Sequence, residues 1–142
     1  MLGPVGAKHS FSGLKDHGLS AHCDATVCHG VNVTLLRAKP VIKRGIDLRL
    51  AECRDYGFKD QITRSGLSIP LNIAEGMERS TPADQCKFLD YARASCGECR
   101  TQAIVGIKVG FIAAEVATPW CRETKQLSAM IQGLIRLIRS RA

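Results

Sequence analysis

The stretch Ser68-Ile69-Pro70-Leu71-Asn72-Ile73-Ala74-Glu75-Gly76 carries a proline and two polar residues inside an apolar-periodic segment and ends on a glycine that we interpret as a helix stop. A proline within a helix removes one backbone hydrogen bond and crowds the carbonyl four residues earlier, which here belongs to Gly66. The residues on both sides continue a helical stripe made of Phe58, Ile62, Gly66, Ile69, Ile73 and Met77. The pattern predicts a kinked, buried helix over about residues 58–78.

Two segments that flank this helix also have helical periodicity. One spans about residues 40–56 and ends at Gly57, with one face formed by Ile42, Ile46, Leu50 and Cys53. The other begins at Ser80-Thr81-Pro82, where a hydroxyl N-cap precedes a proline, and reaches about Ala114. Its seam consists mainly of small residues, namely Phe88, Ala92, Ser95, Cys99, Ala103, Gly106 and Gly110. Small residues allow a neighbouring helix to approach closely.

A last helix opens at Thr118-Pro119 and reaches about Ser140. Its apolar face consists of Leu127, Met130, Ile131, Leu134, Leu137 and Ile138. Four helices with short connections predict an all-α fold, an antiparallel up-and-down four-helix bundle over residues 39–142. We interpret residues 1–38 as a separate, loosely ordered N-terminal extension with a short strand near residues 31–36.

Charge and cysteine content narrow the class of protein. The 142 residues have a formal net charge of +7, and the entire excess lies in residues 37–142, which permits contact with nucleic acid or an acidic partner. The seven cysteines are an odd number, and several occupy apolar helix positions, which favours reduced thiols. We find no signal peptide and no membrane-spanning stretch, so we expect a cytoplasmic protein.

Residues from about 40 to 140 resemble the "four helix bundle protein" family, whose first members were described as intervening-sequence proteins encoded within large-subunit ribosomal RNA genes. The motifs that carry the resemblance are Gly57-Phe58, Gln61, Arg64, Ser68-Ile69-Pro70, Asn72-Ile73-Ala74-Glu75-Gly76, Arg79-Ser80, Phe88-Leu89, Ala92, Ser95, Glu98 and Gln102. The first helix departs from the family pattern, because it starts at Pro40, contains Gly45 and lacks the usual aromatic lead.

The resemblance implies a four-helix bundle that assembles into a ring-like homo-oligomer, commonly a pentamer. A related group serves as an accessory factor to the reverse transcriptase of diversity-generating retroelements and binds nucleic acid through a basic surface. That group lacks the Ser-Ile-Pro and Asn-Ile-Ala-Glu-Gly motifs, so its role does not transfer residue by residue. We expect the partners to be further copies of this chain, RNA or DNA, or a nucleic-acid enzyme such as a reverse transcriptase.

The polar residues of the motif have two interpretations. Asn72, Glu75 and Arg79 follow each other at spacings of three and four and therefore share a helix face. They form either a subunit contact or ligand site, or an internal network in which Asn72 meets groups freed by Pro70 and Glu75 pairs with Arg79. We favour a structural or interface role, and we assign the same role to the remaining motif positions Gln61, Arg64, Pro70 and Gly76.

Two groups of cysteines invite a chemical interpretation. Cys96-Gly97-Glu98-Cys99 is a Cys-x-x-Cys motif, but it lies within a helix, so we interpret both thiols, with Cys53, Cys86 and Cys121, as small core residues. The extension contains a cluster that could supply four zinc ligands, made of His17, His22, Cys23, Cys28 and His29. The spacing of this cluster fits no standard zinc finger, so we expect neither a metal nor a cofactor.

The last helix carries the candidate binding residues. At 100° per residue, Arg122, Lys125, Arg136 and Arg139 fall within one arc opposite the apolar face. This arc is either an ordinary solvated surface or a site for the phosphate backbone, whose affinity a symmetric ring would multiply. Few aromatic residues accompany it, so stacking on bases is not expected.

The sequence contains no Gly-rich phosphate loop, nucleophile elbow or His-Glu-x-x-His motif. We therefore expect a non-enzymatic oligomer that binds nucleic acid or a nucleic-acid-handling partner through basic residues. The alternative is a purely structural or protein-interaction oligomer without nucleic-acid binding. A third hypothesis is a metal or thiol sensor that uses the N-terminal cysteines and histidines.

Overall fold

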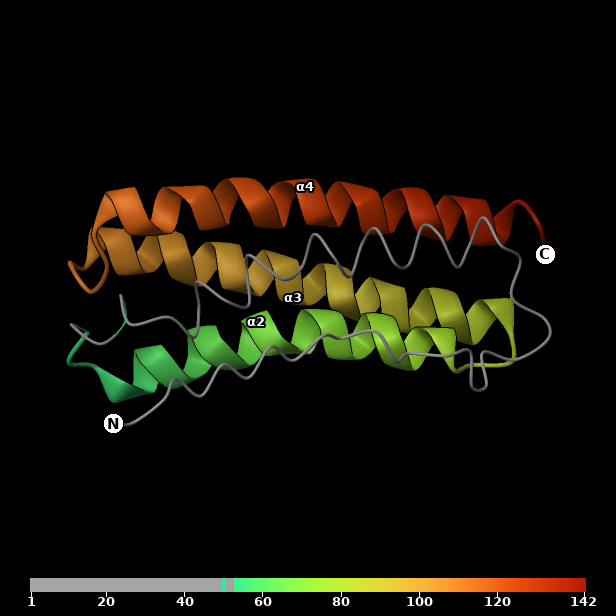
Figure 1. Ribbon diagram of the computed structural model, residues 1–142, viewed down its shortest axis with the longest axis horizontal. Helices are drawn as coiled ribbons and strands as arrows, with labels where there is room; N and C mark the ends of the chain where they lie inside the picture. The colour runs from blue at the N-terminus through green and yellow to red at the C-terminus, as the bar shows by residue number, and fades with distance from the viewer. Residues whose placement is uncertain (1–49, 51–52) are drawn as a thin grey trace, which may run out of the picture.

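The computed structural model describes Leu50 and residues 53–142. This part of the chain consists of three helices, α2 (Tyr56–Met77), α3 (Pro82–Lys108) and α4 (Ala114–Arg139), and has no strand. Consecutive helices run in opposite directions and are joined by short turns (Figure 1). The predicted all-α class is confirmed. The N-terminal extension and nearly all of the helix predicted over residues 40–56 lie outside the described residues.

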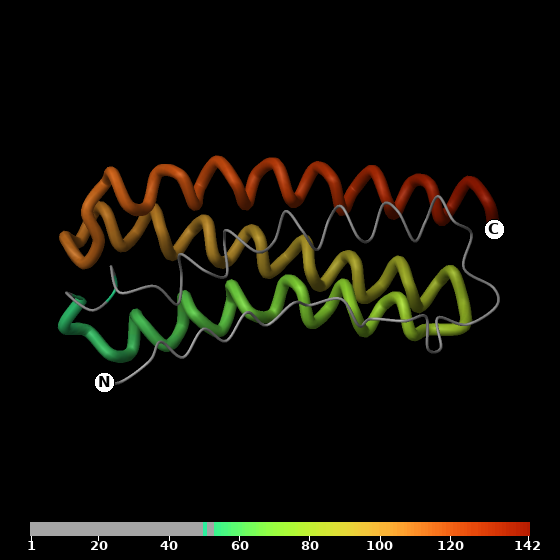
Figure 2. Tube along the Cα trace, in the orientation of Figure 1, coloured from blue at the N-terminus to red at the C-terminus, as the bar shows by residue number. Residues whose placement is uncertain are grey.

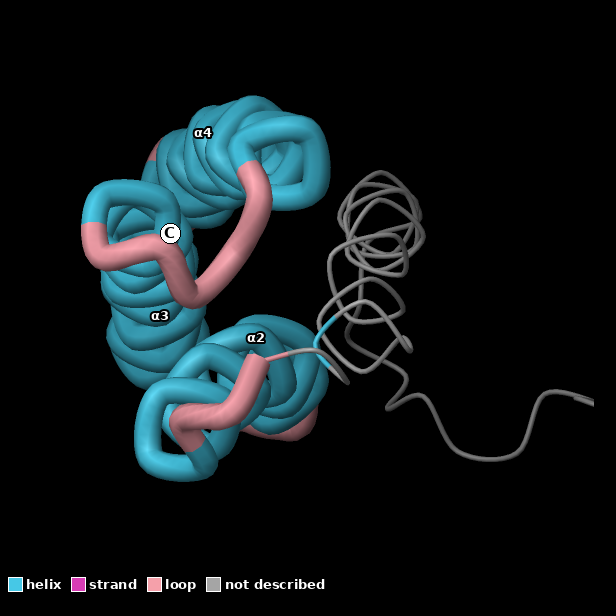
Figure 3. The backbone as a smooth tube through the Cα atoms, turned by 90° about the vertical axis from the view of Figure 1, so that its left-hand side faces the viewer, coloured by secondary structure: helices cyan, strands magenta, loops and turns pink. Residues whose placement is uncertain are grey.

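The three helices are matched in length, and α3 contacts both of the others. They have 22, 27 and 26 residues, which corresponds to roughly 33–40 Å at 1.5 Å per residue. The Cα trace shows them lying alongside one another (Figure 2), and the view from one end places α3 next to α2 and next to α4 (Figure 3). A bilayer-crossing helix needs a long apolar run, and none of these three provides one.

Helix α2 begins earlier than the sequence suggested, and Gly57 is not a helix stop. Asp55 is the N-cap, and its carboxylate accepts a hydrogen bond of 2.7 Å from the backbone N–H of Phe58. This cap makes Tyr56 and Gly57 the first residues of α2, because a capping carboxylate satisfies a backbone donor that the first turn leaves free. The prediction that the preceding helix extends to Tyr56 is therefore wrong. The predicted stripe is confirmed, with Ile62, Ile69 and Ile73 in the core.

The connection from α2 to α3 follows the predicted start signal. Thr81 is the N-cap of α3, and its hydroxyl accepts a hydrogen bond of 3.1 Å from the N–H of Asp84. Gly76, in contrast, does not end α2 as a left-handed glycine, because only Gly110 has a positive φ among the described residues. Gly76 is buried within α2, where an added Cβ would lie 3.1 Å from the Cβ of Phe88. Its role is close contact between α2 and α3.

Helix α3 ends at Lys108, which is six residues earlier than predicted. Gly110 has a φ of 77°, a conformation that favours glycine, so this residue lies in a turn and not in the helical seam. The backbone N–H groups of Phe111 and Ile112 both donate to the carbonyl of Gly106, at 2.8 and 3.2 Å. These bonds occupy a carbonyl near the end of the helix and reverse the chain.

Helix α4 starts at Ala114, four residues before the predicted Thr118-Pro119 opening. Its N-cap, Ala113, provides no side-chain hydrogen bond, but its carbonyl accepts from the N–H groups of Val116 and Ala117 at 3.0 and 3.1 Å. Pro119 therefore lies inside the helix. Because Pro119 is the sixth residue of α4 and lies beyond the first turn, its missing N–H removes one helix bond, the one to the carbonyl of Glu115.

The core forms where large residues of α2 and α4 meet small residues of α3. From α3, Ala92, Cys96, Cys99 and Ala103 are buried. The predicted apolar face of α4 is confirmed, since Leu127, Ile131, Leu134 and Ile138 are buried. Leu50 and Cys53 belong to the same core, as their predicted face requires. Small side chains on the central helix allow both neighbours to approach it, as the predicted seam indicated.

Candidate nucleic-acid interface

All four predicted basic residues of α4, Arg122, Lys125, Arg136 and Arg139, are exposed. They lie away from the buried face that contains Trp120, Leu127 and Ile131, as the helical arc requires. From Thr124 to Arg139 the helix has three basic residues and no acidic one. The outer side of α4 therefore concentrates positive charge, which attracts polyanions.

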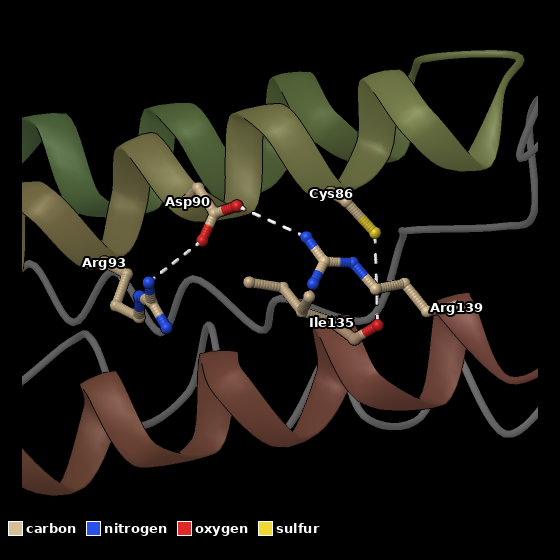
Figure 4. A network of polar contacts seen from close by, with 5 residues as sticks. All are labelled: Cys86, Asp90, Arg93, Ile135 and Arg139. Atoms are coloured by element: carbon tan, nitrogen blue, oxygen red, sulfur yellow. Dashed lines mark hydrogen bonds and ion pairs between the residues drawn. The ribbon is translucent and has the colours of Figure 1, made fainter.

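Arg139 is joined to α3 by an ion pair that the sequence did not indicate. One carboxylate oxygen of Asp90 lies 3.7 Å from Arg139, and the other lies 3.2 Å from Arg93, three residues further along α3. Figure 4 shows Asp90 between the two guanidinium groups. Nearby, the Cys86 thiol donates to the carbonyl of Ile135 at 3.9 Å and links the buried sides of the same two helices (Figure 4). Asp90 thus connects arginines from two helices.

Arg100 is a second arginine that α3 contributes next to α4. The Cys121 thiol of α4 donates to the backbone carbonyl of Arg100 at 4.0 Å. Burial raises the pKa of the Cys121 thiol, and the positive charge of Arg100 partly opposes that shift. Arg93 and Arg100 are seven residues apart, so they lie on the same side of α3, two turns from each other. We name the α3/α4 basic surface by its residues, Arg93, Arg100, Arg122, Lys125, Arg136 and Arg139.

Sequence reasoning found the four basic residues of α4 and missed the two arginines of α3. Periodicity shows that Arg93 and Arg100 share a side, but it does not show which helix that side faces. The contacts of Asp90 and Cys121 with neighbouring helices supply that information. The spacing of seven between the two arginines was the available signal.

The polar motif residues of α2 mostly serve contacts within the molecule. The Asn72 side-chain amide donates to the carbonyl and to the hydroxyl oxygen of Ser68, at 2.8 and 2.9 Å. Ser68 in turn accepts from the Ser95 hydroxyl of α3 at 3.0 Å. The expectation that Asn72 satisfies a backbone group freed by Pro70 does not fit these contacts, because its partner is the carbonyl of Ser68 and not that of Gly66. Pro70 lies half-buried inside α2.

The charged motif residues of α2 pair along the helix. Glu75 pairs with Arg79, as predicted, and Arg64 lies 3.6 Å from Asp60 in an exposed pair. The Arg79 guanidinium also lies over the Phe88 ring of α3, 4.4 Å from its centroid, in a cation–π contact. Gln61 is exposed. These pairs leave the outer side of α2 close to neutral, unlike the outer side of α4.

The described cysteines behave as core residues. Burial, reinforced by the neighbouring Cys99, raises the pKa of Cys96 to about 12. Burial raises the pKa of Cys99 to about 11, with a hydrogen bond from Ser65 acting against it. Thiols with such pKa values are poor nucleophiles at neutral pH. Within the described part of the chain no group of histidine, cysteine and acidic residues is arranged to hold a metal, and the His17–His29 cluster lies outside that part.

Comparisons with known proteins identify relatives. Residues 38–133 match the family model described as "23S rRNA-intervening sequence protein". A crystal structure of a Bacteroides thetaiotaomicron protein, described as having unknown function and as coming from the S23 ribosomal protein family, has 21% sequence identity. The match covers 75% of this chain and 98% of that one, with a TM-score of 0.70, so the two share a fold. Among curated proteins, none matches this chain.

Proposed function

The chain belongs to the 23S rRNA-intervening sequence protein family, and from this premise we propose that it is a non-enzymatic, self-associating protein that binds the phosphate backbone of nucleic acid. The α3/α4 basic surface is the observation that supports the proposal. Six basic residues from two helices lie on this surface, and Asp90 pairs with two of them, Arg93 and Arg139.

The composition of the basic surface sets the mode of binding. Arginine and lysine side chains replace the counterions around phosphates, so affinity depends on the number of contacts and not on base sequence. Trp120 is the only aromatic residue of α4, and it is buried in the core. Without an exposed ring along α4, stacking on bases has no support there. We expect binding to duplex RNA and DNA with little sequence preference.

Self-association is the second part of the proposal. We infer that the bundle has a fourth helix before Cys53, since Leu50 and Cys53 are part of the core although they lie outside the three described helices. We also infer a closed homo-oligomeric ring, in the form of a pentamer, as the resemblance implies. Exposed apolar side chains on α2 and α3 support self-association, because Leu71 of α2 is 67% exposed and Tyr91 of α3 is 47% exposed. A ring would repeat the basic surface and raise its affinity for a long polyanion.

The test is a charge reversal, Arg136→Glu with Arg139→Glu, measured by fluorescence anisotropy with mixed-sequence RNA and DNA duplexes at three salt concentrations. Wild-type binding should weaken steeply with salt. The variant should lower the slope of log Kobs against log salt by about two units, one for each lost phosphate contact. Sedimentation should show an unchanged assembly.

The matched control is Arg54→Glu with Arg64→Glu, which changes the net charge equally through two exposed residues in and next to α2. A loss confined to the Arg136/Arg139 variant supports a localised interface. Equal losses in both variants would indicate only a response to net charge. No binding by the wild type at low salt would overturn the nucleic-acid proposal.

The second candidate function is a structural or protein-interaction oligomer, which the exposed Leu71 and Tyr91 favour. In that case the Arg136/Arg139 reversal would change neither assembly nor any partner contact. A protein that handles nucleic acid, such as a reverse transcriptase, would be a partner consistent with either function. The cysteines, which are free in the described part of the chain, fit a reducing compartment such as the cytoplasm.

A further inference from the structure

Two guanidinium groups from different helices converge on one carboxylate at the edge of the basic surface. Arg93 approaches one oxygen of Asp90 at 3.2 Å, and Arg139 approaches the other at 3.7 Å. The three side chains remain partly in solvent, at 42%, 63% and 40% exposure for Arg93, Arg139 and Asp90. The cluster has one negative and two positive charges, so its net charge is positive.

The carboxylate occupies the place that a phosphate would take. A guanidinium group binds carboxylate and phosphate oxygens through the same planar array of N–H donors. Both distances exceed the roughly 2.7–2.9 Å of a strong charge-assisted hydrogen bond. Exposed pairs of this kind contribute little stability, because water competes for both partners. A phosphodiester group could therefore displace Asp90 from the two arginines without disturbing the core.

The backbone positions of the two arginines do not depend on Asp90. Arg93 lies in the middle of α3, and Arg139 is the last residue of α4. The two helices are held together beneath the cluster by buried residues, including Cys86 and Ile135 (Figure 4). Removal of the Asp90 charge would thus leave the backbone positions of both arginines unchanged, with their partly exposed side chains on the same surface.

We propose that Arg93 and Arg139 form a phosphodiester-binding pair and that Asp90 is an internal competitor, which occupies the pair until a nucleic-acid backbone replaces it. The inference rests on the proposed nucleic-acid binding and identifies one contact of that interface. Asp90 then lowers the affinity for nucleic acid, and the exchange of one anion for another keeps the binding reversible. The ligand is recognised by its phosphate chemistry, which RNA and DNA share.

The experiment compares Asp90→Asn with wild type in the anisotropy assay, using a mixed-sequence RNA duplex and the corresponding DNA duplex. Asparagine keeps the size of the side chain and removes its charge. We expect affinity to rise by about threefold to tenfold, because a phosphate no longer has to displace the carboxylate, while the number of phosphate contacts and therefore the salt slope change little. Circular dichroism should show unchanged helix content.

Two controls separate a local effect from a general one. Glu98→Gln removes an equal charge from an exposed position on α3, eight residues further along. At 100° per residue, Glu98 projects about 80° away from Asp90 around the helix. The double variant Asp90→Asn with Arg139→Ala tests whether the increase in affinity requires Arg139. If it does, the double variant should lose most of that increase.

The outcomes are distinguishable from failure of the proposed function. A gain in Asp90→Asn that exceeds the gain in Glu98→Gln and disappears with Arg139→Ala supports the internal competitor. Equal gains in the two charge-removal variants, or weaker binding in Asp90→Asn, overturn this inference while wild-type binding stands. Absence of binding in wild type and in Asp90→Asn at low salt overturns both proposals.

Discussion

Helix α3 packs against its two neighbours in different ways. We call the interface between α2 and α3 the first seam and the interface between α3 and α4 the second seam. Between α2 and α3, polar side chains meet inside the molecule, where Ser65 donates to the Gln102 side-chain oxygen at 2.7 Å and Ser95 donates to Ser68 at 3.0 Å. Between α3 and α4, apolar residues fill the interior, and the polar contact of Asp90 with Arg139 lies at the surface. The first seam uses its polar groups internally, and the second leaves its charged groups facing solvent.

This difference separates structural residues from candidate binding residues. The most recognisable motif of the sequence lies on α2, and its Ser68 and Asn72 take part in contacts within the bundle. Hydrogen-bonded side chains in a seam fix the register of two helices, because a shifted register would leave buried polar groups without partners. The surplus of positive charge lies instead on α4, where no acidic residue occurs between Thr124 and Arg139.

The largest expected effect is the loss of apolar packing by α4. Trp120 is among the largest fully buried side chains, so Trp120→Ala should lower the free energy of unfolding by about 3–5 kcal/mol, measured by urea denaturation. Such a loss would confirm that α4 depends on interior packing.

Because Trp120→Ala could prevent folding altogether, the milder Ile131→Val should be measured in parallel. Ile131 is fully buried on the same face of α4, and the change should cost about 0.5–1.5 kcal/mol. Leu71→Ala, on the exposed side of α2, is the control and should stay within about 0.5 kcal/mol. If Trp120→Ala lowered the free energy of unfolding as little as Leu71→Ala, apolar packing would not be what holds α4 against α3.

A medium effect is expected where α2 and α3 approach most closely. In Gly76→Ala the new Cβ would lie 3.1 Å from the Cβ of Phe88 and 3.3 Å from the backbone carbonyl oxygen of Gln85. Neither atom can rotate away, so α3 must shift. We expect a loss of about 1–2 kcal/mol in the free energy of unfolding, after the helix propensity of alanine offsets part of the crowding.

Gly133→Ala provides the opposite case on α4. No described atom lies within 4 Å of a Cβ at Gly133, so the substitution should stabilise the protein by about 0.5–1 kcal/mol through helix propensity alone. Thermal unfolding of both variants tests the contrast. Stabilisation by both alanines would show that the first seam tolerates more space than its contacts indicate.

Sequence reasoning succeeded where the signal was local. The stripe through Ile62, Ile69 and Ile73 and the cap at Thr81 depend on neighbours within one or two turns, and the structure agrees with both. The turn after α3 was missed because small and apolar residues continue the helical pattern past Lys108. Gly110 continued the helical spacing of small residues and was therefore assigned to α3. Its positive φ shows that it lies in the turn between α3 and α4. Periodicity alone does not separate a helical glycine from a turn glycine.

The candidate site was predictable only in part, for a related reason. Exposure of Lys125 and Arg136 follows from the apolar face of their own helix, so it could be inferred from one segment. The contribution of Arg93 depends on which side of α3 faces α4, and that is fixed by contacts between segments more than forty residues apart. Asp90 pairs with both an arginine of its own helix and one of α4, and only the second of these pairings required the fold.

The smallest expected effect concerns the hydrogen bond between the two serines of the first seam. Ser95→Ala removes the donor to Ser68 and should cost about 0.5–1.5 kcal/mol, the usual net value of one hydrogen bond. Ser68→Ala should cost at least as much, because Asn72 also donates to the Ser68 hydroxyl. If the two serines act through each other, the double variant will cost less than the sum of the single ones, by about 0.5 kcal/mol or more.

The control is Thr101→Ala, an exposed position on the same helix, which should change the free energy of unfolding by less than about 0.5 kcal/mol. Strict additivity of Ser68→Ala and Ser95→Ala would mean that the two hydroxyls find water or backbone partners separately. The first seam would then be held mainly by packing around Gly76 and Phe88, just as apolar packing holds α4 in the second seam. The two seams would differ only in the positive charge that lies on the solvent side of the second. A clear coupling would keep the two seams distinct and assign Ser68, at the start of the motif, to the register of α2 against α3.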